Sequence, residues 1–395
     1  MINSEVILTD CCEIISGSTP SRKIDEYWGG NINWFTPKDL SKLKSKYIQS
    51  SPEKITQKGL ANCSAKLLPV KSLLLSSRAP IGHIAINREE ACTNQGFKSL
   101  VPKSNLNIEY LYYAIMKIVP KLKDLGNGAT FKEISKETLS RVSIPLPPLP
   151  EQKKIADILD AADSLRQKDQ QLVEHYDRLS QSLFLDMFGD PVTNPMGWER
   201  KSISELCSHI VDCVNRTAKT VDFETKYKMI RTTNVRNYKI DIVNVRYVEK
   251  DVYDKWVRRL TPKKGDIIFT REAPVGEAGI LETDDSVFLG QRTMEYRVNH
   301  EIVTPDYLLH ELMGSNIKNQ IRRLSSGSTV QHLSVLDCKK FQINLPPIKL
   351  QNEFSKRIKE IEKQKELAQQ SLKKSEDLFN SLLQRAFKGE LTHTQ

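Results

Sequence analysis

The chain contains the same kind of long segment twice, and this repetition constrains its fold more than any other feature. Residues 146–187 begin LPPLPEQKKIADILDAADSL, and residues 345–387 begin LPPIKLQNEFSKRIKEIEKQ. After its opening prolines, each segment continues for about ten helical turns without Gly or Pro,. Because Gly and Pro are the residues that interrupt helices, each copy is predicted to form one long helix.

Apolar residues recur along both segments at alternating steps of three and four, the spacing of a coiled-coil seam. In the first segment they are Ile155, Ile158, Ala162, Leu165, Leu172, Tyr176, Leu179 and Leu183, with Asp169 interrupting the series. In the second they are Phe354, Ile358, Ile361, Ala368, Leu372, Phe379, Leu382 and Ala386, around the polar Lys365 and Ser375. A helix with one apolar stripe needs a partner. The duplication favours an antiparallel coiled coil of the two helices over a generic oligomerisation arm, but leaves open whether they pair within one chain or between chains.

The regions before the two helices also repeat, because matching residues keep a nearly constant separation. Pro80 and Gly82 match Pro274 and Gly276 at 194 residues, within the landmarks Arg-Ala-Pro-Ile-Gly (78–82) and Arg-Glu-Ala-Pro-Val-Gly (271–276). Further along, NGATFKEIS (127–135) matches SGSTVQHLS (326–334) at 199 residues, as Gln152 matches Gln351. The chain is therefore predicted to be a tandem duplication of one globular domain plus one long helix.

Short apolar runs separated by turn residues predict an α+β fold dominated by strands for each globular domain. The Pro/Gly-rich segment FGDPVTNPMGW (188–198) indicates a domain boundary,. The predicted limits are 1–147 for the first domain, 148–188 for the central helix, 189–345 for the second domain and 346–390 for the C-terminal helix.

Composition narrows the class of protein. Hydrophobic residues at 39% and charged residues at 27% are values of folded globular proteins,. A net charge of +10 favours a polyanionic partner, although by itself it favours nucleic acid only modestly,. The seven cysteines never form a Cys-x-x-Cys pair, the start lacks a signal peptide, and no apolar run is long enough to span a membrane,. We therefore expect a cytoplasmic protein with buried thiols, no metal and no contact with a membrane.

Motifs for the common nucleic-acid chemistries are missing. The sequence has no Walker A motif, no Gly-x-Gly cofactor loop after a strand and no Asn/Asp-Pro-Pro-Tyr/Phe motif of adenine methyltransferases,. Glu151-Gln152-Lys153 matches the end of a nuclease motif, but its sister position reads Leu-Gln-Asn. We interpret the chain as non-catalytic.

The duplicated plan, the LPPLPEQKKIADILDAADSL block, the FGDPVTNPMGW linker and the C-terminal LFNSLLQRAFKGEL (378–391) together resemble the specificity subunits of type I restriction-modification systems. The resemblance covers nearly the whole chain. It implies that each globular part is a target-recognition domain that reads one half of a split sequence in double-stranded DNA. It also implies that the paired helices act as a spacer and a docking surface for two methyltransferase subunits, which restriction subunits join.

Two further expectations follow from the resemblance. The chain itself binds no cofactor, because S-adenosylmethionine, ATP and Mg belong to the partner subunits. The lead before Ile7 is very short, so an N-terminal helix that completes the family's circular arrangement would be missing or supplied by the C-terminus.

Candidate DNA-binding residues are basic or amide side chains on loops, because phosphates are bound by Lys and Arg and base edges by Arg, Lys, Asn and Gln. In the first domain they are Arg22, Lys23, Lys38, Lys44, Lys46, Arg78 and Lys132. In the second they are Arg216, Lys219, Arg231, Asn234, Arg236, Arg258, Arg259, Arg292, Arg322 and Arg323. Arg78 and Arg271, which the repeat matches, can instead hold the fold, since residues common to both domains cannot distinguish targets.

Two other functions remain open from the residues alone. One is a stand-alone DNA-modifying enzyme whose active site is not recognised, which S-adenosylmethionine binding or DNA cleavage by the isolated chain would reveal. The other is a coiled-coil scaffold that binds no specific sequence, which binding to a random DNA pool would reveal.

Overall fold

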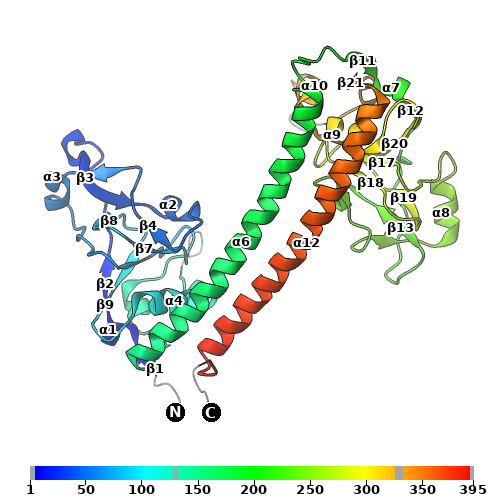
Figure 1. The fold of residues 1–395 in the computed structure, drawn as a ribbon. Coiled ribbons are helices and arrows are strands. Elements are labelled where there is room, and N and C mark those ends of the chain that lie inside the picture. Colours follow the sequence, from blue (N-terminus) through cyan, green and yellow to red (C-terminus); the bar gives the residue numbers. More distant parts are fainter. Residues whose placement is uncertain (1–4, 128–131, 325–331, 392–395) are drawn as a thin grey trace. The chain divides into compact units, whose positions relative to one another are not determined.

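The computed structural model describes residues 5–127, 132–324 and 332–391, and its contacts divide the chain into two compact units. Unit 1 comprises residues 1–170 and 370–395, and unit 2 comprises residues 171–369. Each unit contains one globular domain and one half of each long helix (Figure 1). The unit borders therefore fall inside the helices, whereas the limits read from the sequence fall at the helix ends and stay a prediction.

Domain 1, residues 1–147, contains two mixed sheets and a two-stranded sheet. The five-stranded sheet has the order β2 (Cys12–Ser16), β9 (Lys98–Pro102), β6 (Leu73–Leu75), β7 (Ile84–Asn87) and β4 (Tyr47–Ile48). The three-stranded sheet has the order β5 (Lys54–Ile55), β3 (Trp28–Phe35) and β8 (Ala91–Thr93), and β1 (Glu5–Ile7) pairs with β10 (Ser143–Pro145). The helices are α1 (Leu8–Cys11), α2 (Pro37–Ser41), α3 (Gln57–Ala61), α4 (Ile108–Asp124) and α5 (Lys136–Ser140), with a 3-10 turn at Asp25–Tyr27.

Domain 2, residues 189–345, repeats this plan. Its four-stranded sheet has the order β12 (Cys207–Asp212), β20 (Thr293–Val298), β17 (Ile267–Thr270) and β18 (Ala278–Ile280). A three-stranded sheet has the order β16 (Arg246–Tyr247), β13 (Tyr227–Ile230) and β19 (Ser286–Leu289), β11 (Glu199–Ser202) pairs with β21 (Gln342–Leu345), and β14 (Val235–Arg236) pairs with β15 (Lys239–Ile240). The helices are α7 (Ile203–Leu206), α8 (Lys250–Trp256), α9 (Pro305–Met313), α10 (Ser315–Leu324) and α11 (Val335–Lys339), with a 3-10 turn at Thr232–Asn234. The duplication and the α+β fold are confirmed.

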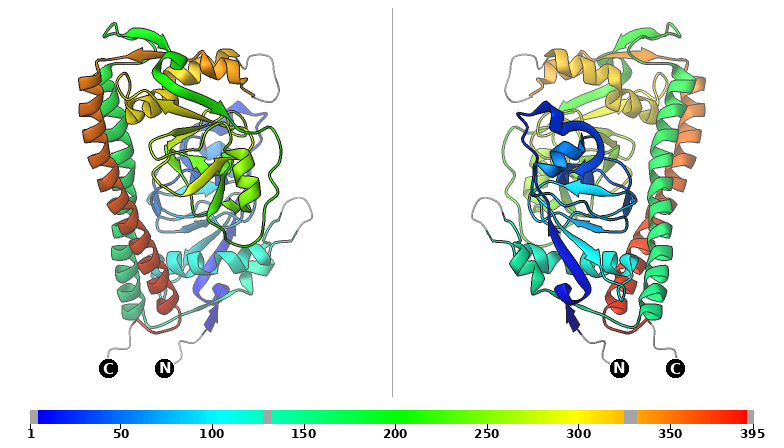
Figure 2. Two further views of the ribbon diagram at one scale, coloured as in Figure 1. Left: turned by 90° about the vertical axis from the view of Figure 1, so that its right-hand side faces the viewer. Right: turned by 90° about the vertical axis from the view of Figure 1, so that its left-hand side faces the viewer.

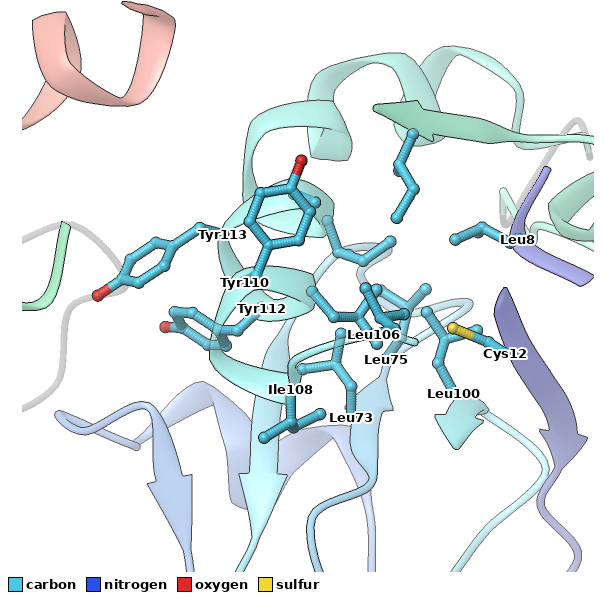
Figure 3. Close-up of a cluster of buried hydrophobic side chains, with 14 of the residues drawn as sticks. Leu8, Cys12, Leu73, Leu75, Leu100, Leu106, Ile108, Tyr110, Tyr112 and Tyr113 are labelled. Carbon is cyan, nitrogen blue, oxygen red and sulfur yellow. The ribbon is translucent and has the colours of Figure 1, made fainter. Parts of the chain in front are cut away.

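The core of unit 1 lies between the five-stranded sheet and α4. Figure 3 shows Leu73 of the sheet beside Ile108 of α4, with Leu75 and Leu100 in the same cluster, whereas Tyr112 and Tyr113 extend from α4 away from these leucines. The same cluster extends to Ile155 on the long helix α6 (Leu149–Phe188) and to Phe379 on the second long helix, α12 (Ile348–Ala386). Burying the apolar face of both helix halves against the domain makes each long helix part of a core.

Unit 2 builds its core from aromatic rings at the same junction. Phe188 of α6 packs edge-to-face on Tyr307 of α9, with ring centroids 4.8 Å apart, and Phe184 packs on Phe354 of α12 at 5.7 Å. All four side chains are buried. Such edge-to-face pairs add to the free energy gained from area burial alone.

One buried glutamine in the first turns of each long helix ties that helix to its domain. Gln152 accepts a hydrogen bond from the Asn107 amide at 2.8 Å and donates to the carbonyls of Asn105 and Pro147. Gln351 repeats this pattern, accepting from the Thr304 amide at 2.9 Å and donating to the carbonyls of Ile302 and Pro346. These bonds satisfy backbone groups at the start of α4 and α9, which explains why the Leu-Pro-Pro segment is followed by Gln in both copies.

Within each unit the halves of α6 and α12 lie side by side and antiparallel (Figure 1 and Figure 2). In unit 1 Ser371 donates to Asp169 at 3.2 Å, and in unit 2 the Lys365 ammonium lies 2.7 Å from the Asp177 carboxylate. The predicted pairing of the two helices is confirmed, and it occurs within one chain.

The predicted seam is wrong in part. Leu165, Leu172 and Leu179 are 45%, 41% and 38% exposed, whereas Leu159 and Asp169 are buried. In unit 1 the buried residues are Ile155, Leu159, Ala162 and Asp169, which are still spaced by combinations of three and four. This series passes through position 166, so Leu165 lies outside it. Asp169 can occupy the seam because Ser371 of the other helix donates a hydrogen bond to it. The sequence pattern does not show that partner.

Among the described residues no helix is both long enough and apolar enough to cross a membrane. The seven cysteines are all free thiols.

Candidate nucleic-acid interface

The three-stranded sheet of each domain contains a pair of neighbouring parallel strands whose carboxyl ends are followed by short connections. In domain 2, β13 runs parallel to β19, with Ile230 opposite Leu289, and in domain 1, β3 runs parallel to β8, with Phe35 opposite Thr93. We call the residues that follow these strand ends, together with the loops packed on them, the carboxyl edge of each domain. Loops at the carboxyl ends of parallel strands are a common place for ligand binding.

The carboxyl edge of domain 2 encloses a cavity of about 320 Å³. Its lining residues are Arg216, Thr217, Ala218, Thr220, Met229, Arg231, Thr232, Thr233, Arg246, Trp256, Gly290, Gln291 and Arg292. Four of these are arginines and none is Asp or Glu. A cavity of this composition offers positive charge, hydroxyl groups, an amide and an aromatic face, which are the groups that nucleic acids bind.

Gly290 allows the two halves of this edge to approach closely. Its amide donates to the Ile230 carbonyl at 2.7 Å, and a Cβ atom at this position would lie 2.8 Å from the same oxygen and 3.3 Å from Cγ of Arg231. A larger residue would therefore push the β19–β20 loop away from β13, and with it Gln291 and Arg292.

Two arginines of this edge differ in how they are held. The buried Nε of Arg231 has no hydrogen-bond partner among the described residues. The Nε of Arg292 lies 2.8 Å from the carboxylate of Glu272, which also pairs with Nδ1 of His332. The Arg292 side chain is 56% exposed, so this half-exposed guanidinium is held from behind by a mostly buried carboxylate.

The carboxyl edge of domain 1 carries amides and hydroxyls instead. The backbone amide of Asn94 donates to the Phe35 carbonyl at 3.0 Å, which holds Asn94 at this edge. The Thr19 hydroxyl donates to the side-chain oxygen of Gln95. Arg22, the nearby cation, lies 3.8 Å over the Trp28 ring and pairs bidentately with Glu53. Both terminal amino groups of Arg22 are therefore occupied by Glu53.

Backbone hydrogen bonds correct the match between the two copies near this edge. The Ser77 amide donates to the Gly96 carbonyl at 2.7 Å, and the Arg271 amide donates to the Arg292 carbonyl at 2.8 Å. Ser77 thus corresponds to Arg271, and Arg78 corresponds to Glu272. The pairing of Arg78 with Arg271 read from the sequence is wrong by one residue.

The structure brings three of the predicted DNA-binding residues, Arg216, Arg231 and Arg292, into the domain 2 cavity. Residues that sequence reasoning missed there include Arg246, Gln291 and Trp256. A signal existed for Gln291, because Asn-Gln-Gly (94–96) and Gly-Gln-Arg (290–292) follow matching strands at a separation of 196 residues. The position of Arg246 opposite Met229 depends on a strand pairing that the sequence does not reveal.

Other predicted residues bond to the protein itself. Lys46 is largely buried and pairs with Asp160 of α6, and Asn234, 3% exposed, donates to the Asn244 carbonyl at 2.9 Å. Arg236 donates to the carbonyls of Thr232 and Val235, Arg259 lies 2.7 Å from Asp212, and Arg78 lies 3.3 Å from Glu133. These contacts give each of the five a role in the fold. Their contact with DNA stays a prediction.

The remaining predicted residues are exposed outside the lining of the cavity. They are Lys23, Lys38, Lys44 and Lys132 in domain 1, and Lys219, Arg258, Arg322 and Arg323 in domain 2. Lys219 lies between the lining residues Ala218 and Thr220, and Arg258 follows Trp256 by two positions. Lys38 lies on α2, close after the carboxyl end of β3, and Arg322 donates to the side chain of Asn319 at 3.1 Å. The contact of these eight residues with DNA also stays a prediction.

Comparison with known proteins identifies the class. The model of the type I restriction modification DNA specificity domain matches residues 3–175 and again residues 195–376. The MjaIX specificity subunit of Methanocaldococcus jannaschii is 36% identical over 262 residues, which cover 62% of this chain and 58% of that protein. The MjaVIII specificity subunit of the same organism is 24% identical and covers 95% of this chain and 91% of its own length.

Solved structures show the same fold. The specificity subunit from M. genitalium aligns over 98% of this chain and 96% of its own, with a TM-score of 0.57 and 14% identity. A structure from work on the assembly and conformational transition of the type I R-M system aligns over 98% of both chains, with a TM-score of 0.54 and 17% identity.

The two matches of the family model together cover most of the chain, and each contains one of the two domains described above. The protein therefore belongs to the type I restriction-modification DNA specificity family. It is a specificity subunit with two target-recognition domains, which are domain 1 and domain 2. Specificity subunits are the non-catalytic, DNA-recognition members of these systems, which decides against the stand-alone enzyme and against the non-specific scaffold.

Proposed function

We propose that this chain reads a split sequence in double-stranded DNA, with domain 1 contacting one half and domain 2 the other. The observation that carries the proposal is the domain 2 cavity, lined by four arginines and no carboxylate, on a frame that domain 1 repeats with different side chains. The net charge of +10 supports attraction to the phosphate backbone,. A shared frame with different side chains is what two readers of different sequences need.

The helices supply a docking surface for two methyltransferase subunits, one on each unit. Leu179 in unit 2 and Leu378 in unit 1 are sister positions separated by 199 residues, and they are 38% and 46% exposed. Leu172 and Leu367 in unit 2 and Leu165 in unit 1 are also exposed. Large apolar side chains exposed on a helix favour contact with another protein.

In this function the chain binds no cofactor itself. S-adenosylmethionine is held by the methyltransferase subunits, and ATP and Mg by the restriction subunits that complete the complex. The complex acts in the cytoplasm, on DNA that carries the split sequence.

The test is to purify the chain with and without its methyltransferase subunits and to map methylated adenines on a plasmid library. We expect one split motif from the complex and no methylation from the chain alone. DNA binding by the complex should weaken steeply with salt, because each neutralised phosphate contributes about 0.9 to the slope of log affinity against log salt. Methylation without a split motif, or catalysis by the chain alone, would contradict the proposal.

A further inference from the structure

The pair of Arg292 and Glu272 belongs to domain 2 alone. Hydrogen-bond register places Gly96 of domain 1 at the position of Arg292, and Arg78 at the position of Glu272. The next pair has its acid and base in exchanged places. In domain 1 the base Arg78 pairs with the acid Glu133, and in domain 2 the acid Glu272 pairs with the base His332. A pair that is absent from the sister domain is not required by the shared frame.

The surroundings of Arg292 indicate that its guanidinium is held in one orientation. It lies on the cavity rim with a positive φ of 69°, a backbone conformation that few residues other than Gly and Asn adopt,. Its backbone carbonyl accepts the Arg271 amide at 2.8 Å, and its Nε is held by Glu272 at 2.8 Å. The contact at Nε leaves the two terminal amino groups for a ligand.

This geometry suits a base edge better than a phosphate. A phosphate contact needs only positive charge, and an adjacent carboxylate would weaken it through repulsion. A bidentate contact with O6 and N7 of guanine needs a fixed fork, which a carboxylate on Nε provides. The neighbouring Gln291 adds a further polar group to the same edge.

We propose that Arg292, oriented by Glu272, reads a guanine in the half of the target that domain 2 recognises. The inference rests on the proposed function, since it assigns a base to one of its two readers. Glu272 is a positioning residue in this scheme, and His332 helps to hold its carboxylate.

The experiment uses the complete chain with its methyltransferase subunits and compares methylation motifs from a library randomised at both half-sites. Arg292→Gln should lower the preference for guanine at one position of the domain 2 half by roughly 10- to 100-fold. The domain 1 half should stay the same, and the salt dependence of binding should change little. Arg292→Lys keeps the charge but not the fork, so it should also lose guanine preference at that position.

Two further variants sharpen this test. Glu272→Gln keeps a hydrogen-bond acceptor but not the charge, so it should relax the same position by less than Arg292→Gln does. The matched control is Arg141→Gln, because Arg141 is an exposed arginine of domain 1 that pairs with Glu137 at 2.6 Å. The control should leave the motif unchanged.

Different outcomes test the guanine contact and the proposed function. An unchanged motif in Arg292→Gln, with affinity lowered equally for all sequences and a salt slope reduced by about 1, would show a phosphate contact and overturn the inference. An Arg292→Lys variant that kept the full preference for guanine would overturn the inference as well. If the unmodified complex gave no split motif, the proposed function itself would fail.

Discussion

The carboxyl edges of the two domains occupy the same place on the same frame, yet they present different side chains. Domain 1 offers Asn94, Gln95 and Thr19, and its Arg22 pairs with Glu53. Domain 2 offers arginines around a cavity of about 320 Å³. The order of four strands of the larger sheet and the parallel strand pair are retained in both domains. So are the hydrogen bonds of the buried Gln152 and Gln351, which we call the glutamine clamps. The difference teaches that the repeated residues build the frame, and that recognition lies in the residues that do not repeat.

The largest expected effect comes from giving the chain two copies of one edge. The hybrid chain carries a second copy of residues 8–144 instead of residues 203–343. The two segments begin and end at equivalent points, because the Leu8 amide donates to the Val142 carbonyl at 2.8 Å and the Ile203 amide donates to the Phe341 carbonyl at 2.9 Å. We expect methylation mapping of the resulting complex to show the domain 1 half-site in both halves of the motif.

The control for this exchange is the unmodified chain, and the hybrid must retain methylation before its motif is compared. Phe184 and Phe354 would meet Tyr110 and Tyr113 in place of Tyr307 and His310, so assembly should be checked by size and by thermal unfolding. A hybrid that assembles and still reads the original second half would refute the assignment of half-sites to domains.

The shared frame is tested by the glutamine clamps. Gln152→Ala and Gln351→Ala each remove three hydrogen bonds from a buried site and leave their backbone partners unpaired. Each should lower the free energy of unfolding of its own unit by about 4 kcal/mol. Hydrogen exchange read by mass spectrometry should rise in unit 1 for the first variant and in unit 2 for the second.

The matched control is Gln364→Ala, since Gln364 is exposed on α12 and should leave both units unchanged. Equal loosening of both units by either variant would mean that the clamps do not act locally.

A smaller effect separates the two domains by pH. Glu311 of α9 is buried, which raises its pKa to about 7, whereas the sister position in domain 1 is Ala114. The folded state therefore holds a proton that the unfolded chain releases above pH 4.5. The stabilisation is complete below pH 4.5 and is lost as the pH rises to 7, a change of about 3 kcal/mol,.

The measurement is urea unfolding of the unmodified chain and of Glu311→Gln at several pH values. Burial lowers the pKa of the neighbouring His310, which has the opposite effect on stability as the pH falls, so the difference between the two proteins is the quantity to follow. As the pH rises from 4.5 to 7, the Glu311→Gln variant should become more stable relative to the unmodified chain, because Gln cannot ionise,. A difference that stays constant over this range would show that Glu311 is already ionised in the fold.

Some individual residues have contacts within the fold that the sequence does not show, because many of their partners lie far away along the chain. Lys46 carries the positive charge of a phosphate contact, but it pairs with Asp160, which lies 114 residues later in the chain. Asn234 has the amide that reads adenine, but its own loop uses that amide. Arg78 matches Arg271 as a letter, and only the hydrogen bonds of Ser77 and Arg271 show that Glu272 is its counterpart.

By itself the sequence determined the duplication, the two long helices, the α+β class and the family, because these depend on periodicity, on Gly and Pro, and on motifs that repeat at constant separation. Only the tertiary structure decided which side chains share the carboxyl edge, which cations are neutralised, and which helix positions face the seam. The physical reason is that hydrogen bonds, ion pairs and strand register join residues distant in the chain. Arg216, Arg246 and Arg292 become one site only when those contacts are made.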